Sequence, residues 1–545
     1  MSIGSLFIAQ LYQLPPRRHA VGKSLSLRVV MDDGVELLTD HYAPKTAGPH
    51  PTLLMRLPYG RRGFAPVAEV YAERGYNVVL QACRGTEESG GRFDPLVNER
   101  KDGLATLEWI KAQLWFDGRI GLTGPSYLGY AQWAICDALP ATSAMATKVT
   151  SSEFQSVVFP SGAFHLGLWL SWMQVIEGLR GNPLKMTGRM FSGTVERLTH
   201  KAAMHLPLVE GDEIVTGHRV PFWREWFENA IGNDEFWREM DHRHRLSETT
   251  PPNHFVSGWY DFMIDQLLRD YTTLVGFGHR PHLTIGPWTH VSGELQAESL
   301  RQTLHWMNAK LLEDPSGLRE HPVRIYVTGT ETWHEFESFP PGAFSATQFY
   351  LNEEEKLTEQ APTIDAATDT YTYDPADPTP NIGGAMFAFK GAGPADNAAR
   401  EARNDVLCFS TEPLAQPVTI IGQSDVVLFA SAELEHTDFF VRLCDVDPQG
   451  KSLNITDGLL RVTPNTPRQT DGTWRLEFTL HATAHCFLRG HRIRVQVSSG
   501  AHPRYARNLG TGEPLGTTTT LLTNAVTVHR DAEHPSSIML RCYEL

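Results

Sequence analysis

Short apolar runs alternate with a segment of helical period along the first 147 residues. Three runs have the length of buried strands and end in turn-forming residues: "PTLLMRLPYG" (51–60), "YNVVLQACRG" (76–85) and "GRIGLTGPSY" (118–127). Between the last two, residues 103–116 repeat apolar side chains at helical spacing as far as Leu114. The stretch 25–44 alternates like a strand and is broken by Asp-Asp-Gly, which predicts a hairpin. Alternating strands and helices predict a parallel sheet covered by helices.

The pattern changes three times after this first region. Residues 148–247 contain aromatic segments of helical period without clear strands between them. Apolar runs resembling the first ones return within 248–345, and from residue 346 onward strand-like runs recur with Gly, Pro and Asp between them. We therefore predict an α/β domain in two parts (1–147 and 248–345), a helical cap (148–247) and a β-sandwich domain (346–545).

Composition excludes some classes of function. The formal net charge of -15 over 545 residues argues against a nucleic-acid partner, which requires a basic face. No run approaches the roughly 20 apolar residues of a membrane span, so we expect no membrane partner. The first residues lack a basic start and a small-residue cleavage site, and this predicts a cytoplasmic protein. The six cysteines are scattered, which predicts free thiols and no metal site.

Ser126 is the first candidate for catalysis, because it follows an apolar run in "IGLTGPSYLGYAQW". A sharp turn from a strand into a helix exposes a serine hydroxyl, and glycines on both sides relieve the crowding of such a turn. Gly124 has the expected spacing, but Leu128 stands where the common G-x-S-x-G motif has its second glycine, and Gly129 follows it. On spacing alone, this pattern is most often an ordinary turn.

Two later segments favour a role for Ser126 as a nucleophile. "HFVSGWYD" is an apolar run that ends in Asp261, and "HLTIGPWTH" is another that reaches His290. The order serine, acid, histidine is that of α/β hydrolytic enzymes, in which a serine needs a base and an oriented third group. The carboxyl ends of parallel strands share one edge of a sheet, so we expect the three side chains to meet there.

At this point the chain resembles a known family, the cocaine-esterase and X-Pro dipeptidyl-peptidase family of α/β-hydrolases. The resemblance rests on "GPSYLGYAQW", "GWYD", "GPWTH", "RLPYG" and "RGTEESGGRF", together with two stretches of the third domain, and it extends over nearly the whole chain. It implies an α/β-hydrolase domain with a helical cap insertion and a C-terminal jelly-roll β-sandwich packed on it. The family elbow is G-x-S-Y-x-G, so Leu128 is expected. The resemblance also implies an oxyanion hole made by the hydroxyl of Tyr59 and the backbone N–H of Tyr127.

The chain departs from the family pattern at two informative places. Ala82 stands where the family often has an Asp before its Arg-Gly pair, and we expect this change to alter the bracing of that loop. Relatives that act on amino-acid esters bind an ammonium group with carboxylates just after the triad acid. Here Phe262, Met263 and Ile264 follow Asp261, which disfavours such a substrate.

We expect a serine carboxylesterase that hydrolyses a small-molecule ester through an acyl-enzyme on Ser126, with no cofactor. Trp169 and Trp172 of the cap, with Phe262 and Met263, are candidates for an apolar acyl pocket, although core packing alone would also explain both tryptophans. An amidase or β-lactam acylase of the same family is the alternative, since both chemistries pass through an acyl-enzyme. A catalytically inactive binding protein is the third reading. A homodimer is left open.

Overall fold

The computed structural model describes residues 2–22, 24–46, 48–230 and 234–545. Within them, the first part of the chain forms a ten-stranded sheet in the order β1-β2-β4-β3-β5-β6-β7-β8-β9-β10. Its strands are β1 (Leu25–Val30), β2 (Glu36–Tyr42), β3 (His50–Leu57), β4 (Asn77–Ala82), β5 (Phe116–Pro125), β6 (Ser143–Lys148), β7 (Asn253–Tyr260), β8 (His282–Thr289), β9 (Val323–Val327) and β10 (Thr332–Phe336).

The sheet is mixed, whereas the alternation of strands and helices predicted a parallel one. Within the series β4-β3-β5-β6-β7-β8-β9, each strand is parallel to the next, as expected for strands joined by helical crossovers. The antiparallel pairs are β1 with β2, β2 with β4, and β9 with β10. The connections from β1 to β2 and from β9 to β10 are a few residues long, and a tight turn can join only antiparallel strands.

Helices cover both faces of this sheet. One apolar cluster joins the sheet to the helices α1 (Ile3–Leu11), α2 (Arg61–Ala72) and α13 (Gly293–Leu311). A second cluster joins the other face to α3 (Glu99–Lys111), α4 (Tyr127–Trp133) and α12 (Ile264–Gly276). The helical pattern had been expected to continue to Leu114, but α3 ends at Lys111 and Leu114 is exposed, because the chain is already turning into β5.

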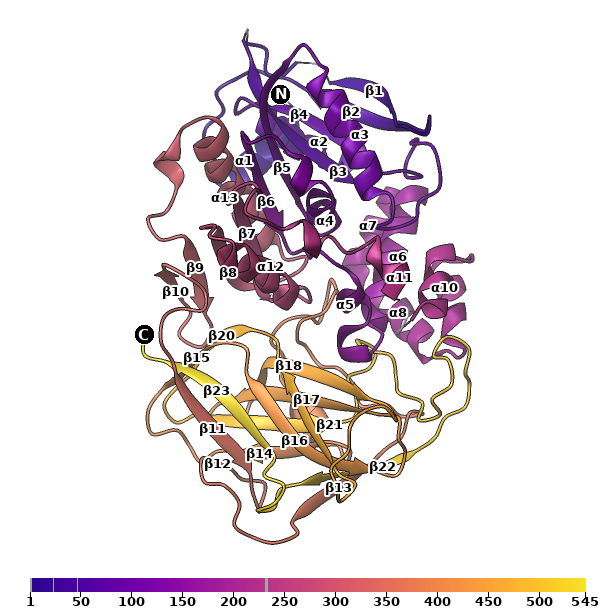
Figure 1. Cartoon of the computed structure of the whole chain (residues 1–545), viewed down its shortest axis with the longest axis vertical. Coiled ribbons are helices and arrows are strands. Elements are labelled where there is room, and N and C mark those ends of the chain that lie inside the picture. Colours follow the sequence, from indigo (N-terminus) through magenta and orange to yellow (C-terminus); the bar gives the residue numbers. More distant parts are fainter. Residues whose placement is uncertain (1, 23, 47, 231–233) are drawn as a thin grey trace.

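Seven α-helices lie between β6 and β7 in the described part of the chain and form the cap, where the described residues show no long strand. They are α5 (Gln155–Val158), α6 (Leu166–Gly181), α7 (Pro183–Ser192), α8 (Thr194–Met204), α9 (Gly211–Thr216), α10 (Pro221–Glu228) and α11 (Asp234–Arg238). The first eleven residues of α6 are all buried, because this helix is enclosed on every side by the cap and its neighbours. Figure 1 shows the cap beside the sheet domain, with the third domain below both.

The third domain is an antiparallel β-sandwich. Its larger sheet contains β11 (Ser345–Leu351), β12 (Leu357–Thr358), β13 (Thr368–Tyr373), β15 (Val418–Gly422), β16 (Asp425–Ala432), β19 (Trp474–Thr479), β20 (Thr483–Phe487), β22 (Asn524–His529) and β23 (Ser537–Tyr543). Its smaller sheet has the order β14-β21-β17-β18, from β14 (Leu407–Ser410), β21 (Arg492–Ser498), β17 (Thr437–Val446) and β18 (Ser452–Val462). A short helix, α14 (Ala398–Glu401), precedes β14. The two sheets enclose one apolar cluster.

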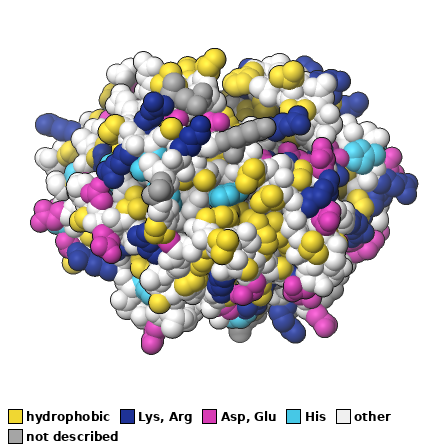
Figure 2. All heavy atoms as spheres, turned by 90° about the horizontal axis from the view of Figure 1, so that it is seen from above, with side chains coloured by type: hydrophobic (Ala, Val, Ile, Leu, Met, Phe, Trp, Pro, Cys, Tyr) yellow, Lys and Arg dark blue, Asp and Glu magenta, His cyan; other side chains and the backbone are white. Residues whose placement is uncertain are grey.

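Surface charge is mixed over the end of the molecule that Figure 2 shows. Basic and acidic side chains are interspersed there with hydrophobic ones, and they form no continuous basic area on that face. In the described part of the chain, no helix combines the length and the apolar character that crossing a bilayer requires.

Candidate active site

Ser126 occupies a strained turn between β5 and α4. Its backbone has φ 58° and ψ -121°, a region that side-chain-bearing residues avoid and that recurs at functional sites. Neighbouring glycines make the turn possible. A Cβ on Gly124 would lie 2.4 Å from Cβ of Leu128, and a Cβ on Gly129 would lie 2.5 Å from Cγ2 of Thr150. The second small residue is therefore needed at 129, where Thr150 packs, and Leu128 fills the space that Gly124 leaves.

The turn brings Ser126 within reach of His290 and Asp261. Nε2 of His290 lies 3.1 Å from Oγ of Ser126, and Nδ1 of the same ring lies 2.5 Å from Oδ2 of Asp261. Asp261 and His290 directly follow β7 and β8, which are adjacent parallel strands. The three side chains thus lie at one edge of the sheet, in the geometry of a nucleophile, a base and a group that orients the base.

The acid is held from two sides. Asp261 is fully buried, and its Oδ1 accepts a hydrogen bond of 2.8 Å from the backbone N–H of Met263. Its other oxygen faces the imidazole, so Nδ1 of His290 carries the proton and Nε2 is left as the acceptor toward Ser126. The ring of Phe262 lies against the imidazole at a centroid distance of 4.5 Å and limits its motion.

Tyr59 is a hydrogen-bond donor at this site. The indole Nε1–H of Trp172, which can only donate, gives a hydrogen bond of 3.1 Å to Oη of Tyr59. The hydroxyl proton of Tyr59 is therefore free to point elsewhere, and Ser126 is a neighbour of this hydroxyl. Burial raises the pKa of Tyr59 to about 12, so the phenol stays protonated at neutral pH.

Tyr127 is fixed at the start of α4. As the first residue of the helix, it has no preceding turn that could accept its backbone N–H. Its phenol donates to Oε1 of Glu99 (2.8 Å) and accepts from the N–H of Leu96 (2.9 Å). Glu99 in turn pairs with the buried guanidinium of Arg56 at 2.9 Å. This buried chain of contacts fixes the backbone beside Ser126.

A narrow cavity of about 20 Å³ opens beside these groups. It is lined by Tyr59, Pro95, Leu96, Ser126, Tyr127, Phe154, Leu168, Trp169, Trp172, Phe262, Met263, His290 and Phe387. All four residues predicted for an acyl pocket are among them. Trp169 and Trp172 come from α6 of the cap, so the cavity lies between the cap and the sheet domain.

Sequence reasoning missed Phe387, which belongs to the third domain. Its ring lies 5.6 Å from that of His290 and 6.2 Å from that of Phe262, and its side chain is 8% exposed. The available signal was local: "GGAMFAFKGAG" (383–393) places two phenylalanines in a glycine-rich loop, where exposed aromatic side chains would be unusual.

The loop after β4 is braced in another way than the family pattern suggests. Arg84 donates to both carboxylate oxygens of Asp102, at 3.0 and 2.5 Å, and to both of Asp33, at 2.9 and 3.2 Å. These two acids hold the arginine, while Ala82 is the last residue of the buried strand β4. Gly85 lets this loop fold closely against itself, because a Cβ there would lie only 2.1 Å from the backbone N of Phe93.

Among the described residues, one group outside this site has the composition of a metal site. Ligand atoms of His529, Asp531 and His534 all lie within 4.8 Å of one another. The protein engages both rings: His529 pairs with Oγ of Ser431 at 3.0 Å, and His534 pairs with Asp471 at 2.8 Å. The group begins at His529, the last residue of β22 in the sandwich. The cysteines are free thiols.

Comparisons with known proteins match the chain along most of its length. Residues 33–292 match the family described as X-Pro dipeptidyl-peptidase (S15 family), and residues 317–539 match the X-Pro dipeptidyl-peptidase C-terminal non-catalytic domain. A cocaine esterase from Rhodococcus sp. (strain MB1 Bresler) is 32% identical, over 94% of this chain and 97% of that protein.

Solved structures share the fold. An α-amino acid ester hydrolase is 23% identical with a TM-score of 0.79, and the match covers 97% of this chain and 98% of that one. An aminopeptidase from a marine sediment Thaumarchaeota archaeon is 24% identical with a TM-score of 0.78, and the match covers 96% of each chain. The chain therefore belongs to the cocaine-esterase and X-Pro dipeptidyl-peptidase family of serine hydrolases, with an α/β-hydrolase domain, a helical insertion and a C-terminal antiparallel β-sandwich.

Proposed function

We propose that the protein is a carboxylesterase that forms an acyl-enzyme on Ser126 from an ester with an uncharged, apolar acyl group. The observation that carries this proposal is the cavity beside Ser126. Among the described residues, every side chain that lines it is apolar or hydroxyl-bearing, except for the imidazole of His290. A cavity with such a lining favours an apolar group by removing its surface from water.

None of the described residues that line the cavity is acidic, and this distinguishes the proposed activity from the activities of two structural neighbours. A substrate with a free ammonium group requires an acidic partner when it leaves water. Asp265 is the first acid after Asp261 in the chain, and its carboxylate accepts hydrogen bonds from His481 and Ala482 of the sandwich. It is therefore engaged away from the cavity, and an amino-ester or aminopeptidase activity is disfavoured.

The proposed reaction uses side chains of this chain alone. Oγ of Ser126 attacks the ester carbonyl while Nε2 of His290 takes its proton, and Asp261 stabilises the imidazolium. The hydroxyl of Tyr59 and the N–H of Tyr127 donate to the oxyanion of the tetrahedral intermediate. The imidazolium then protonates the departing alcohol. Water, activated by the same histidine, releases the acid and restores Ser126.

Two measurements test this function together. Incubation with a fluorophosphonate should label the protein once, at Ser126, and the Ser126→Ala variant should stay unlabelled. Hydrolysis of p-nitrophenyl butyrate should then exceed that of the matched butyryl p-nitroanilide by a large factor. Faster cleavage of the anilide would favour the amidase alternative. Absence of a stoichiometric adduct would favour a binding protein without catalysis.

A further inference from the structure

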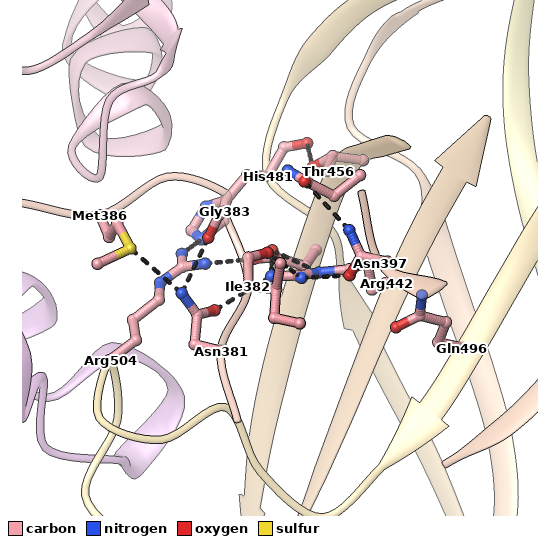
Figure 3. A network of polar contacts seen from close by, with 12 residues as sticks. Asn381, Ile382, Gly383, Met386, Asn397, Arg442, Thr456, His481, Gln496 and Arg504 are labelled. Atoms are coloured by element: carbon pink, nitrogen blue, oxygen red, sulfur yellow. Dashed lines mark hydrogen bonds and ion pairs between the residues drawn. The ribbon is translucent and has the colours of Figure 1, made fainter. Parts of the chain in front are cut away.

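A cluster of buried charges in the sandwich lies between two segments that reach the active site. Asp457 of β18 accepts hydrogen bonds from Arg442 of β17 (2.9 Å) and from Arg504 (2.6 Å), and each of the three side chains is at most 2% exposed. Figure 3 shows both arginines at the centre of a wider set of polar contacts. The two guanidinium groups overcome the effect of burial and lower the pKa of Asp457, so it stays ionised.

From this cluster, Arg442 holds the base of the loop that carries Phe387. Its guanidinium donates to Oδ1 of Asn381 (3.1 Å) and to the carbonyl of Ile382 (2.5 Å). The amide of Asn381 then donates to the carbonyl of Gly383 (2.9 Å), as Figure 3 shows. Gly384 must lack a side chain, because a Cβ there would lie 2.9 Å from Oδ2 of Asp457.

The loop is closed at its neck and held at its tip. Gly384 and Gly393 exchange two backbone hydrogen bonds, at 2.7 and 3.0 Å. Beyond Phe387, the N–H groups of Phe389 and Lys390 both donate to Oε1 of Glu196, on α8 of the cap. Phe387 therefore projects into the cavity from a loop that is fixed at both ends.

On its other side, the cluster holds the start of α12. Arg504 donates to Nε2 of His481 (3.0 Å), so the proton of this imidazole is on Nδ1, which faces Oδ2 of Asp265 at 2.5 Å. Asp265 lies in the first turn of α12, two residues after Met263, which lines the cavity. The N–H of Ala482 also donates to Asp265, at 2.9 Å.

We propose that the cluster of Arg442, Asp457 and Arg504, acting through Asn381 and His481, is a positioning unit that sets the width of the acyl cavity. One arm of the unit, Arg442 with Asn381, fixes Phe387. The other arm, Arg504 with His481, fixes Phe262 and Met263. The sandwich therefore determines which acyl groups fit. The residues of the unit touch neither the substrate nor the reacting atoms. This inference rests on the proposed function in one respect, namely that the cavity holds the acyl group.

The proposal is tested by variants that remove the contacts of one arm at a time and leave the ion pairs of Asp457 with both arginines intact. In Asn381→Ala and His481→Gln, we expect the ratio of kcat/KM for p-nitrophenyl octanoate to that for the acetate to change by about tenfold or more, because misfit by single methylenes has effects of this size. The matched control is Asp438→Asn, which breaks the Arg461–Asp438 pair, a 2.8 Å contact in the same sandwich. We expect the control to lower the melting temperature and to leave the ratio unchanged.

An unchanged ratio in both variants, with only a lower melting temperature, would overturn the proposal and leave the cluster a purely structural role. The same comparison is made with fluorophosphonates that carry methyl or octyl chains, by measuring the rate of modification of Ser126. This readout does not require turnover. If fluorophosphonates modify Ser126 of the wild type but the protein hydrolyses no ester, the proposed function fails. The ratio of the modification rates with the octyl and methyl reagents still decides whether the cluster has the positioning role.

Discussion

At the scale of single residues, the backbone of Ser126 combines strain with function. Its φ of 58° is compatible with glycine at low cost, whereas any Cβ is crowded there. We expect Ser126→Gly to abolish esterase activity and to raise the free energy of unfolding by about 1 kcal/mol, part of the 1–3 kcal/mol typical of such strain. Urea unfolding measures this.

The matched control for that substitution is Ser126→Ala. It removes the same hydroxyl but keeps the Cβ, so we expect equal loss of activity without the gain in stability. Equal stability of the two variants would show that the turn stores no strain at Ser126.

Tyr59 permits a second prediction at this scale. Tyr59→Phe removes one of the two proposed oxyanion donors, and such losses reduce kcat by about 100- to 1,000-fold. We expect KM for a p-nitrophenyl ester to change little, since the donor acts mainly on the transition state. Trp172→Phe removes the hydrogen bond that Tyr59 accepts and trims the cavity wall but keeps the hydroxyl of Tyr59, so it should retain more of kcat than Tyr59→Phe. A loss below fivefold in Tyr59→Phe would remove this hydroxyl from the oxyanion hole.

At the scale of elements, the position of α4 depends on its contact with the segment after β6. A Cβ on Gly129 would overlap the side chain of Thr150, with distances of 2.5 to 2.7 Å to its three atoms. We expect Gly129→Ala to destabilise the protein by about 1–3 kcal/mol, as overpacking does, and to lower kcat by displacing the N–H of Tyr127. Thermal unfolding and steady-state kinetics measure both effects.

A helical glycine without close neighbours serves as the control. Gly63 lies within α2 with open space around its Cα, so Gly63→Ala should be neutral or slightly stabilising. If the two substitutions had the same effect, packing against Thr150 would not determine where α4 lies.

Strand β6 carries a buried amine that affects stability. Lys148 is 4% exposed, no acidic side chain among the described residues pairs with it, and burial lowers its pKa to about 7. Between pH 7 and about 10.4, the unfolded chain binds this proton and the folded one does not, so stability from this group rises with pH. We expect Lys148→Met to be more stable at pH 7 and to lack that rise. Parallel stability curves for variant and wild type would contradict this.

At the scale of the whole molecule, three parts of the chain enclose the cavity: the sheet domain, the cap and the sandwich. Because Phe387 forms the wall contributed by the sandwich, Phe387→Ala should enlarge the cavity and favour bulky acyl groups. We expect the ratio of kcat/KM for benzoyl to acetyl esters to rise about tenfold. Phe478→Ala, which truncates a half-buried phenylalanine of β19, should leave the ratio unchanged.

Much of this arrangement was predictable from patterns along the chain. Alternating apolar runs and helical periods indicated the class of the sheet domain, because the period of burial differs between strands and helices. The places of Asp261 and His290 just after apolar runs indicated that they meet Ser126, because parallel strands end at one edge. The Asp-Asp-Gly break within 25–44 indicated the antiparallel edge hairpin of β1 and β2. The antiparallel pairing of β2 with β4 was less predictable, since burial patterns do not encode the direction of a neighbouring strand.

The sequence by itself determined the elements, the order of the domains and the residues proposed for the chemistry, because these depend on local spacing and on groups that only certain side chains carry. Only the tertiary structure placed Phe387 beside His290, brought Asp33 and Asp102 to Arg84, and linked Asp265 to the buried charges of the sandwich. These contacts join residues far apart along the chain, and their geometry is set by the packing of whole domains, which no local pattern records.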